Sequence, residues 1–88
     1  MKTYIFYQIA YRRNNNGYYQ IMSCVTKGVF ADKEKVIKVA DDSMTSMHET
    51  YGGIVTEHSK FDNEVYDTTI EWSDSKTAFI VTEHEVIA

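Results

Sequence analysis

The chain has 88 residues, 43% of them hydrophobic and 14% aromatic, and a net charge of −4, which fits one globular domain over residues 1–88 and excludes a disordered chain. Its single cysteine, Cys24, excludes an intramolecular disulfide and indicates a reducing compartment. Because the first residues lack the small-residue cleavage site of a signal peptide and no apolar run is long enough to span a bilayer, we expect a soluble, cytoplasmic protein.

Two strands joined by a tight turn are predicted at the start of the chain. Residues 3–12 and 18–27 are rich in Tyr, Ile, Phe and Val, which favour extended structure. Asn16-Gly17 between them suits the positive φ angles of a hairpin turn. The first strand is apolar at its odd positions and at most of its even positions, so it is either covered on both sides or partly exposed for a partner.

The next segment is predicted to form one helix. Asp32 is a suitable N-cap, and Gly52-Gly53 suits the left-handed backbone just beyond a helix end. The side chains of Asp41-Asp42-Ser43 compete for backbone hydrogen bonds, but the continuous apolar spacing favours an uninterrupted helix. Its expected buried stripe consists of Val36, Ile37, Ala40, Met44, Met47 and Tyr51.

Three further strands are predicted at residues 54–60, 65–72 and 77–86, separated by turn-forming Asp, Asn and Ser residues. The middle strand alternates, with Tyr66, Thr68, Ile70 and Trp72 expected on the covered side and Asp67, Thr69 and Glu71 on the other. The register of the last strand stays open: either Phe79 and Val81 or Ile80 and Thr82 face the helix.

The order of elements is therefore ββαβββ, which predicts a single α+β domain. We expect a mainly antiparallel five-stranded sheet with one long helix packed on one face. The helix is the crossover between the second and third strands, so the third runs in the same direction as the second. Two sheet orders fit equally well, namely 2-1-3-4-5 and 2-1-5-4-3.

The pentapeptide Ile-Val-Thr-Glu-His occurs at residues 54–58 and again at residues 80–84. Neighbouring side chains of a strand point to opposite faces, so the Glu and His of one copy do not converge on one ion. If the two copies flank the fourth strand, His58 and His84 lie about 9.5 Å apart, too far to share a metal. We interpret the repeat as two strands with preferred β residues, and expect no metal and no other cofactor.

Cys24 and His48 are the two residues from which a nucleophile and a base would have to be assembled. Cys24 lies among apolar strand residues, so we expect a buried and inert thiol. His48 lies at the border of the helical stripe, which is typical of a half-buried structural histidine. No third, orienting group accompanies them, so the protein is predicted not to be an enzyme.

The hairpin turn is flanked by basic and aromatic residues, Arg12, Arg13, Tyr18 and Tyr19. Such residues form platforms for single-stranded nucleic acid, although an acidic protein repels the phosphate backbone everywhere except at such a tip. The alternative prediction is thus a small accessory domain that binds RNA or single-stranded nucleic acid.

Charge is unevenly distributed along the chain. Residues 1–40 contain seven Lys and Arg against two acids, whereas residues 41–88 contain eleven acids against two Lys. The acids of the last three strands form either a surface that attracts a basic partner or a charged edge that prevents aggregation. The candidate partner-binding carboxylates are Asp62, Glu64, Asp67, Glu71, Asp74, Glu83 and Glu85.

Tyr7 and Tyr11 of the hairpin are expected to add apolar contact area, either to a partner or to a second copy of the chain. The leading prediction is a non-enzymatic interaction protein whose partner handles nucleic acid. A phage-type inhibitor of a host or defence protein is such a protein, and anti-CRISPR proteins are one class of them.

Overall fold

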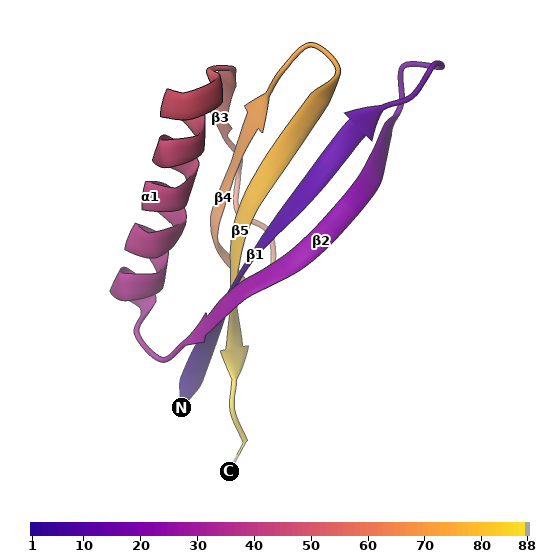
Figure 1. Ribbon diagram of the computed structural model, residues 1–88. Helices are drawn as coiled ribbons and strands as arrows, with labels where there is room; N and C mark the ends of the chain where they lie inside the picture. The colour runs from indigo at the N-terminus through magenta and orange to yellow at the C-terminus, as the bar shows by residue number, and fades with distance from the viewer. Residues whose placement is uncertain (88) are drawn as a thin grey trace.

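The computed structural model describes residues 1–87 and has the predicted ββαβββ order in a single α+β domain (Figure 1). The elements are β1 (Lys2–Arg13), β2 (Tyr19–Phe30), α1 (Lys33–Tyr51), β3 (Ile54–Glu57), β4 (Glu64–Glu71) and β5 (Ser75–Glu85). The strands form one sheet in the order β2-β1-β5-β4-β3, and every neighbouring pair is antiparallel. Of the two expected orders, the structure therefore has 2-1-5-4-3, with the first and last strands at the centre.

The β1–β2 hairpin turns at the predicted glycine. Gly17 has φ +84°, and the Asn14 side-chain oxygen accepts hydrogen bonds from the backbone N–H groups of Asn16 and Tyr18 at 2.9 and 3.0 Å. The register between the two strands shifts twice, which leaves Lys27 and Met22 of β2 without a partner in β1. Such bulges bend and twist an edge strand.

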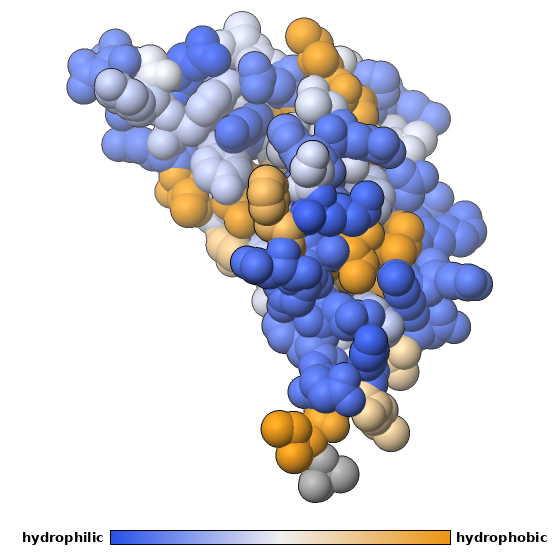
Figure 2. Space-filling view, turned by 180° about the vertical axis from the view of Figure 1, so that it is seen from behind, coloured by the Kyte–Doolittle hydropathy of each residue, from blue (hydrophilic) through white to orange (hydrophobic). Residues whose placement is uncertain are grey.

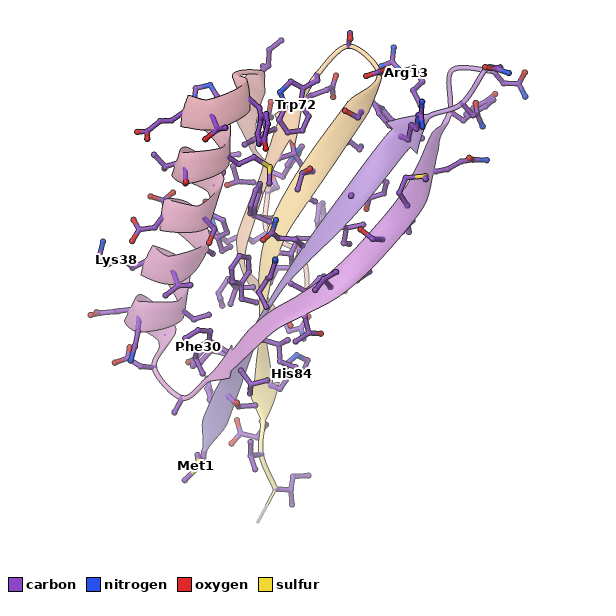
Figure 3. All side chains as sticks on the ribbon, viewed as in Figure 1. Met1, Arg13, Phe30, Lys38, Trp72 and His84 are labelled. Atoms are coloured by element: carbon purple, nitrogen blue, oxygen red, sulfur yellow. The ribbon has the colours of Figure 1, made fainter. Side chains whose placement is uncertain are left out.

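The helix α1 begins and ends where predicted and continues through the Asp-Asp-Ser segment. The Asp32 side chain accepts a hydrogen bond from the Lys35 N–H at 3.1 Å, and Gly52 has φ +69°. Val36 and Ala40 are fully buried. Tyr51, however, is 69% exposed, so its assignment to the buried stripe is wrong. Trp72 packs against this end of the core instead (Figure 3). Its Nε1 donates a hydrogen bond to the Tyr51 carbonyl oxygen at 3.1 Å.

One face of the sheet packs against the helix and forms the core. Register places alternate residues of the three central strands on this face. Its main members are Tyr4, Phe6, Tyr66, Ile70, Phe79 and Val81. Phe79 and Val81 thus face the helix, which decides the register of the last strand, and the predicted alternation of β4 is confirmed. Burial, together with a hydrogen bond from its hydroxyl to Asp41, raises the pKa of Tyr66 to about 12.

Candidate interaction surface

The opposite face of the sheet has no helix over it in the part of the chain that the structure describes. We name it the uncovered face. Residues that lie directly opposite one another in β2, β1, β5 and β4 point to the same side of the sheet, and this register defines which residues belong to the face. Its members are Tyr19, Ile21, Cys24, Thr26 and Val29 of β2, Thr3, Ile5, Tyr7, Ile9, Tyr11 and Arg13 of β1, Lys76, Ala78, Ile80, Thr82 and His84 of β5, and Glu64, Asp67, Thr69 and Glu71 of β4. Ala78 and Ile80 are only 4% and 9% exposed, because neighbouring strands surround them. The rim of the face remains open to solvent.

Five of the nine predicted partner-binding residues meet on the uncovered face, namely Tyr7, Tyr11, Glu64, Asp67 and Glu71. Asp62 lies in the turn before β4 with φ +50°, and Asp74 lies in the turn between β4 and β5. Seen from behind, the molecule carries apolar side chains in separate patches among polar ones (Figure 2). A surface of this mixed kind is typical of reversible contacts rather than of a permanent interface.

A bulge in β4 places Glu64 on the same face as Asp67, three residues along. The register with β5 shifts between Glu64 and Tyr66, so that Glu64 lies opposite Thr82 while Asp67 lies opposite Ile80. In a regular strand, residues three apart point to opposite faces. Alternation alone would therefore put Glu64 against the helix, and no pattern in the sequence marks the bulge.

Asp67 is a carboxyl group of this surface whose pKa departs from its ordinary value. Partial burial and the neighbouring Glu64 raise the pKa of Asp67, while His58 and Lys60 oppose the rise. Burial and the charge of Glu64 also raise the pKa of Tyr7. Within residues 1–87, the three ion pairs use other acids, so Glu64 and Asp67 are not neutralised by a salt bridge there. The two carboxylates thus form a compact acidic site beside a tyrosine.

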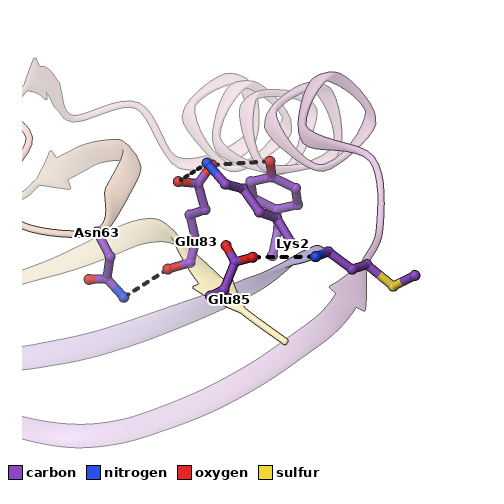
Figure 4. A network of polar contacts seen from close by, with 6 residues as sticks. Lys2, Asn63, Glu83 and Glu85 are labelled. Atoms are coloured by element: carbon purple, nitrogen blue, oxygen red, sulfur yellow. Dashed lines mark hydrogen bonds and ion pairs between the residues drawn. The ribbon is translucent and has the colours of Figure 1, made fainter. Parts of the chain in front are cut away.

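Glu83 and Glu85 belong to a different cluster at the far end of β5 (Figure 4). Glu83 accepts hydrogen bonds from the Lys2 ammonium at 3.4 Å and from the Tyr4 hydroxyl at 3.1 Å, and Glu85 accepts one from the amino terminus at 3.3 Å. The Tyr4 and Lys2 contacts lower the pKa of Glu83. These carboxylates hold β1 to β5, so the seven predicted acids do not form one continuous array.

A basic and aromatic cluster occupies the other end of the uncovered face. The Arg13 guanidinium lies 5.0 Å from the centroid of the Tyr19 ring and donates to its hydroxyl at 2.9 Å. The Lys76 ammonium lies 4.4 Å from the Tyr19 ring centroid and 4.9 Å from that of Tyr11. Sequence reasoning missed Lys76, because only the pairing of β1 with β5 brings it beside Tyr11.

The four predicted nucleic-acid-binding residues do not all meet. Arg13 and Tyr19 are together, but Arg12 pairs with Ser75 on the other side of β1. Tyr18 is 73% exposed and lies at the hairpin turn. Arg13 and Lys76 already lie over the Tyr19 ring, so a base that stacks on this ring has to compete with them.

The two repeated histidines are held apart by their own strands. The Nε2 atom of His58 lies 2.8 Å from the Thr69 hydroxyl, and that of His84 lies 2.8 Å from the Thr82 hydroxyl. The two copies of the pentapeptide lie on opposite sides of β4, because β4 lies between β3 and β5 in the sheet. Among the described residues, no three His, Cys, Asp or Glu side chains are grouped so as to hold a metal ion.

Cys24 and His48 are both exposed, so the expectations of a buried thiol and a half-buried histidine are wrong. Cys24 is exposed because β2 is an edge strand and Cys24 points to the uncovered face. His48 is on the last turns of α1, where its Nε2 lies 3.2 Å from the Gly53 carbonyl oxygen. The sheet separates the two side chains, which therefore make no nucleophile and base pair.

Comparisons with protein-family models, with curated proteins and with solved structures give no match. Within residues 1–87, no helix combines the length and apolar content needed to cross a bilayer. The candidate function therefore rests on the geometry of the surface.

Proposed function

We propose that the protein is a non-enzymatic interaction protein that binds a basic surface on a protein that handles nucleic acid. A phage-type inhibitor of a host or defence protein, such as an anti-CRISPR protein, acts in this way. The binding site would be the acidic site of Glu64 and Asp67, with Tyr7 beside it. The two carboxylates would bind a Lys or Arg of the partner and occupy the position where a nucleic-acid phosphate otherwise binds.

The observation that carries this proposal is the unneutralised pair of carboxylates on a rigid strand. Burial and repulsion from the like charge of Glu64 both disfavour ionisation of Asp67 and raise its pKa. A cation from a partner would remove this repulsion and gain two charge-assisted hydrogen bonds. Tyr7, which lies opposite Ile80 in the neighbouring strand, would add apolar contact area next to the charges.

The net charge of the chain also favours fast association with a basic partner. The net charge of −4 attracts a basic partner over a distance of about a Debye length, roughly 8 Å at physiological salt. The association rate constant should therefore fall as salt is added, whereas the dissociation rate constant should change less.

Affinity capture from the native host cell, with the tagged chain as bait, tests this proposal. Wild type and Asp74→Lys should retain the same partner, and Asp67→Lys should lose it, with an affinity at least about tenfold lower. Asp74→Lys is the matched control, since it makes the same charge change in the β4–β5 turn. Equal retention of the partner by Asp67→Lys, in a variant with wild-type circular dichroism, would refute the acidic site.

A second candidate is favoured by one observation, the two cations Arg13 and Lys76 held within 5.0 Å of the Tyr19 ring centroid. Two fixed cations are a suitable contact for the backbone of single-stranded nucleic acid. Gel shifts with short RNA and DNA strands at low and high salt distinguish the candidates, because only this one requires direct and salt-sensitive binding of the strand.

A further inference from the structure

The uncovered face has opposite charges at its two ends. Arg13 and Lys76 lie at the end near the hairpin tip, where Glu71 offsets one of the two cations, and Glu64 and Asp67 lie toward the other end. Lys76 and Ile80, the β5 neighbour of Asp67, are four residues apart along β5, a separation of roughly 13 Å in an extended strand. Small and apolar side chains lie between the two ends, namely Ile9, Ala78 and Ile80.

We infer that a second copy of this chain packs on the uncovered face and forms a two-fold symmetric dimer in which the Arg13 and Lys76 end of each copy lies over the Glu64 and Asp67 end of the other. In an interface of this symmetry every contact occurs twice. The two sheets would pack face to face, with the partly exposed side chains of Tyr7 and Ile9 of each copy near the middle, because Ala78 and Ile80 are already almost fully buried within one chain.

Charge complementarity selects a second copy over another occupant. A uniformly basic partner that covered the whole face would satisfy the acidic end but repel Arg13 and Lys76 at the other, and an acidic partner would do the reverse. The occupant that satisfies both ends must carry the same charges in the reverse order at the same spacing. A second copy related by a two-fold axis meets this requirement by symmetry.

The size of the face indicates a weak, reversible dimer. β1 has 12 residues and β5 has 11, so the face is roughly 36 Å long, and four strands at a spacing of about 4.8 Å make it roughly 14 Å wide. The resulting area of about 500 Å² per copy lies below the roughly 800 Å² of a standard stable interface. We therefore expect a monomer in exchange with a dimer at micromolar concentrations.

This dimer goes beyond the proposed function and does not depend on it. The two share Glu64 and Asp67, so the dimer and the complex with a basic partner exclude each other. Self-association needs no other protein, so the test of the dimer succeeds or fails independently of the test of the proposed function.

Sedimentation equilibrium of the whole chain over about 1 to 500 μM, with a reducing agent to keep Cys24 from forming a disulfide, measures the dimer. Wild type should show a concentration-dependent dimer that weakens as salt is added. Lys76→Glu and Asp67→Lys should each weaken it at least about tenfold, because each places like charges opposite one another twice. Lys38→Glu, which makes the same charge change as Lys76→Glu but on the exposed side of α1, should leave the dimer unchanged.

Mixing the two weakened variants provides the decisive measurement. In the mixture, the carboxylate introduced by Lys76→Glu in one chain faces the ammonium introduced by Asp67→Lys in the other. The native Asp67 of the first chain faces the native Lys76 of the second, so a heterodimer should form with about the wild-type affinity. Circular dichroism establishes that each variant is folded.

Three results would overturn the inference. The first is a wild type that stays monomeric over the whole concentration range. The second is a dimer that persists in both variants, as pairing through the β2 edge would give. The third is a mixture of folded variants that stays monomeric.

Discussion

The replacement of Gly53 by alanine tests how closely the start of β3 approaches β4. Gly53 has φ +97°, and an added Cβ would lie 2.7 Å from Ile70 Cγ2, 2.8 Å from Trp72 Nε1 and 3.0 Å from the Glu71 carbonyl oxygen. The positive φ costs a side chain about 1–2 kcal/mol. The steric conflict adds about 1–3 kcal/mol, because a core side chain and a backbone carbonyl must move. Gly53→Ala should thus lower the free energy of unfolding by about 2–5 kcal/mol.

Gly17→Ala is the matched control, since Gly17 has φ +84° but no atom within 4 Å of an added Cβ. Its loss should be limited to the backbone cost of about 1–2 kcal/mol. Urea denaturation followed by far-UV circular dichroism measures both variants. Trp72 fluorescence is a second probe, and the two should agree if unfolding is two-state. If Gly53→Ala loses no more stability than Gly17→Ala, the close contact with Ile70 and Trp72 does not constrain the fold as described.

Three further variants test the electrostatics and the helix start. The folded-state pKa of Asp67 is raised, so its contribution to stability is present below the unfolded pKa and is lost as the pH rises through the folded pKa. Asp67→Asn should therefore stabilise the fold at pH 7, by about 0.5 kcal/mol or less for this partly exposed group, and have no effect below about pH 4. A gain that persists at pH 3 contradicts the raised pKa of Asp67, since burial and the charge of Glu64 penalise only its ionised form. The pKa of Glu83 is lowered, so its stabilisation is present at neutral pH and lost as the pH falls through the folded pKa. Glu83→Gln should accordingly reduce the dependence of the unfolding free energy on pH below about pH 4.5. If the variant loses as much stability on acidification as the wild type, the contact between Glu83 and Tyr4 does not stabilise the fold. Asp32→Ala removes the helix cap and should cost about 1 kcal/mol in urea denaturation, with Asp32→Asn nearly neutral as its control.

Local features of the fold were predictable because neighbouring residues determine them. The positive φ of Gly17 in the hairpin turn, the Asp32 cap and the alternation of β4 each depend on residues close in the chain, whereas Asn16 does not adopt the positive φ that was also expected. They require only the preference of a side chain for one backbone conformation or one face. The order of the elements followed from these local signals.

Features that depend on strand pairing could not be predicted from the sequence. Both sheet orders satisfied the same local rules, and only the structure shows that β1 pairs with β5 rather than with β3. The same pairing brings Lys76 to Tyr11 and Tyr19. The candidate site depends further on the bulge that turns Glu64 toward Asp67, and a bulge of one residue reverses the face of every residue before it.

The first and last strands of the chain, β1 and β5, pair with each other at the centre of the sheet. The N- and C-termini accordingly lie close to the same end of the molecule (Figure 1). β1 can find its inner neighbour only after residues 75–85 have been synthesised, and those residues also bring Phe79 and Val81 to the core. A nascent chain that has β1 to β4 therefore still lacks the middle of its sheet and cannot fold step by step as it emerges. Folding should be a single late event, slow for a domain of this size because its key contacts span nearly the whole sequence. A chain that stops before β5 should therefore remain unfolded and accessible to proteases.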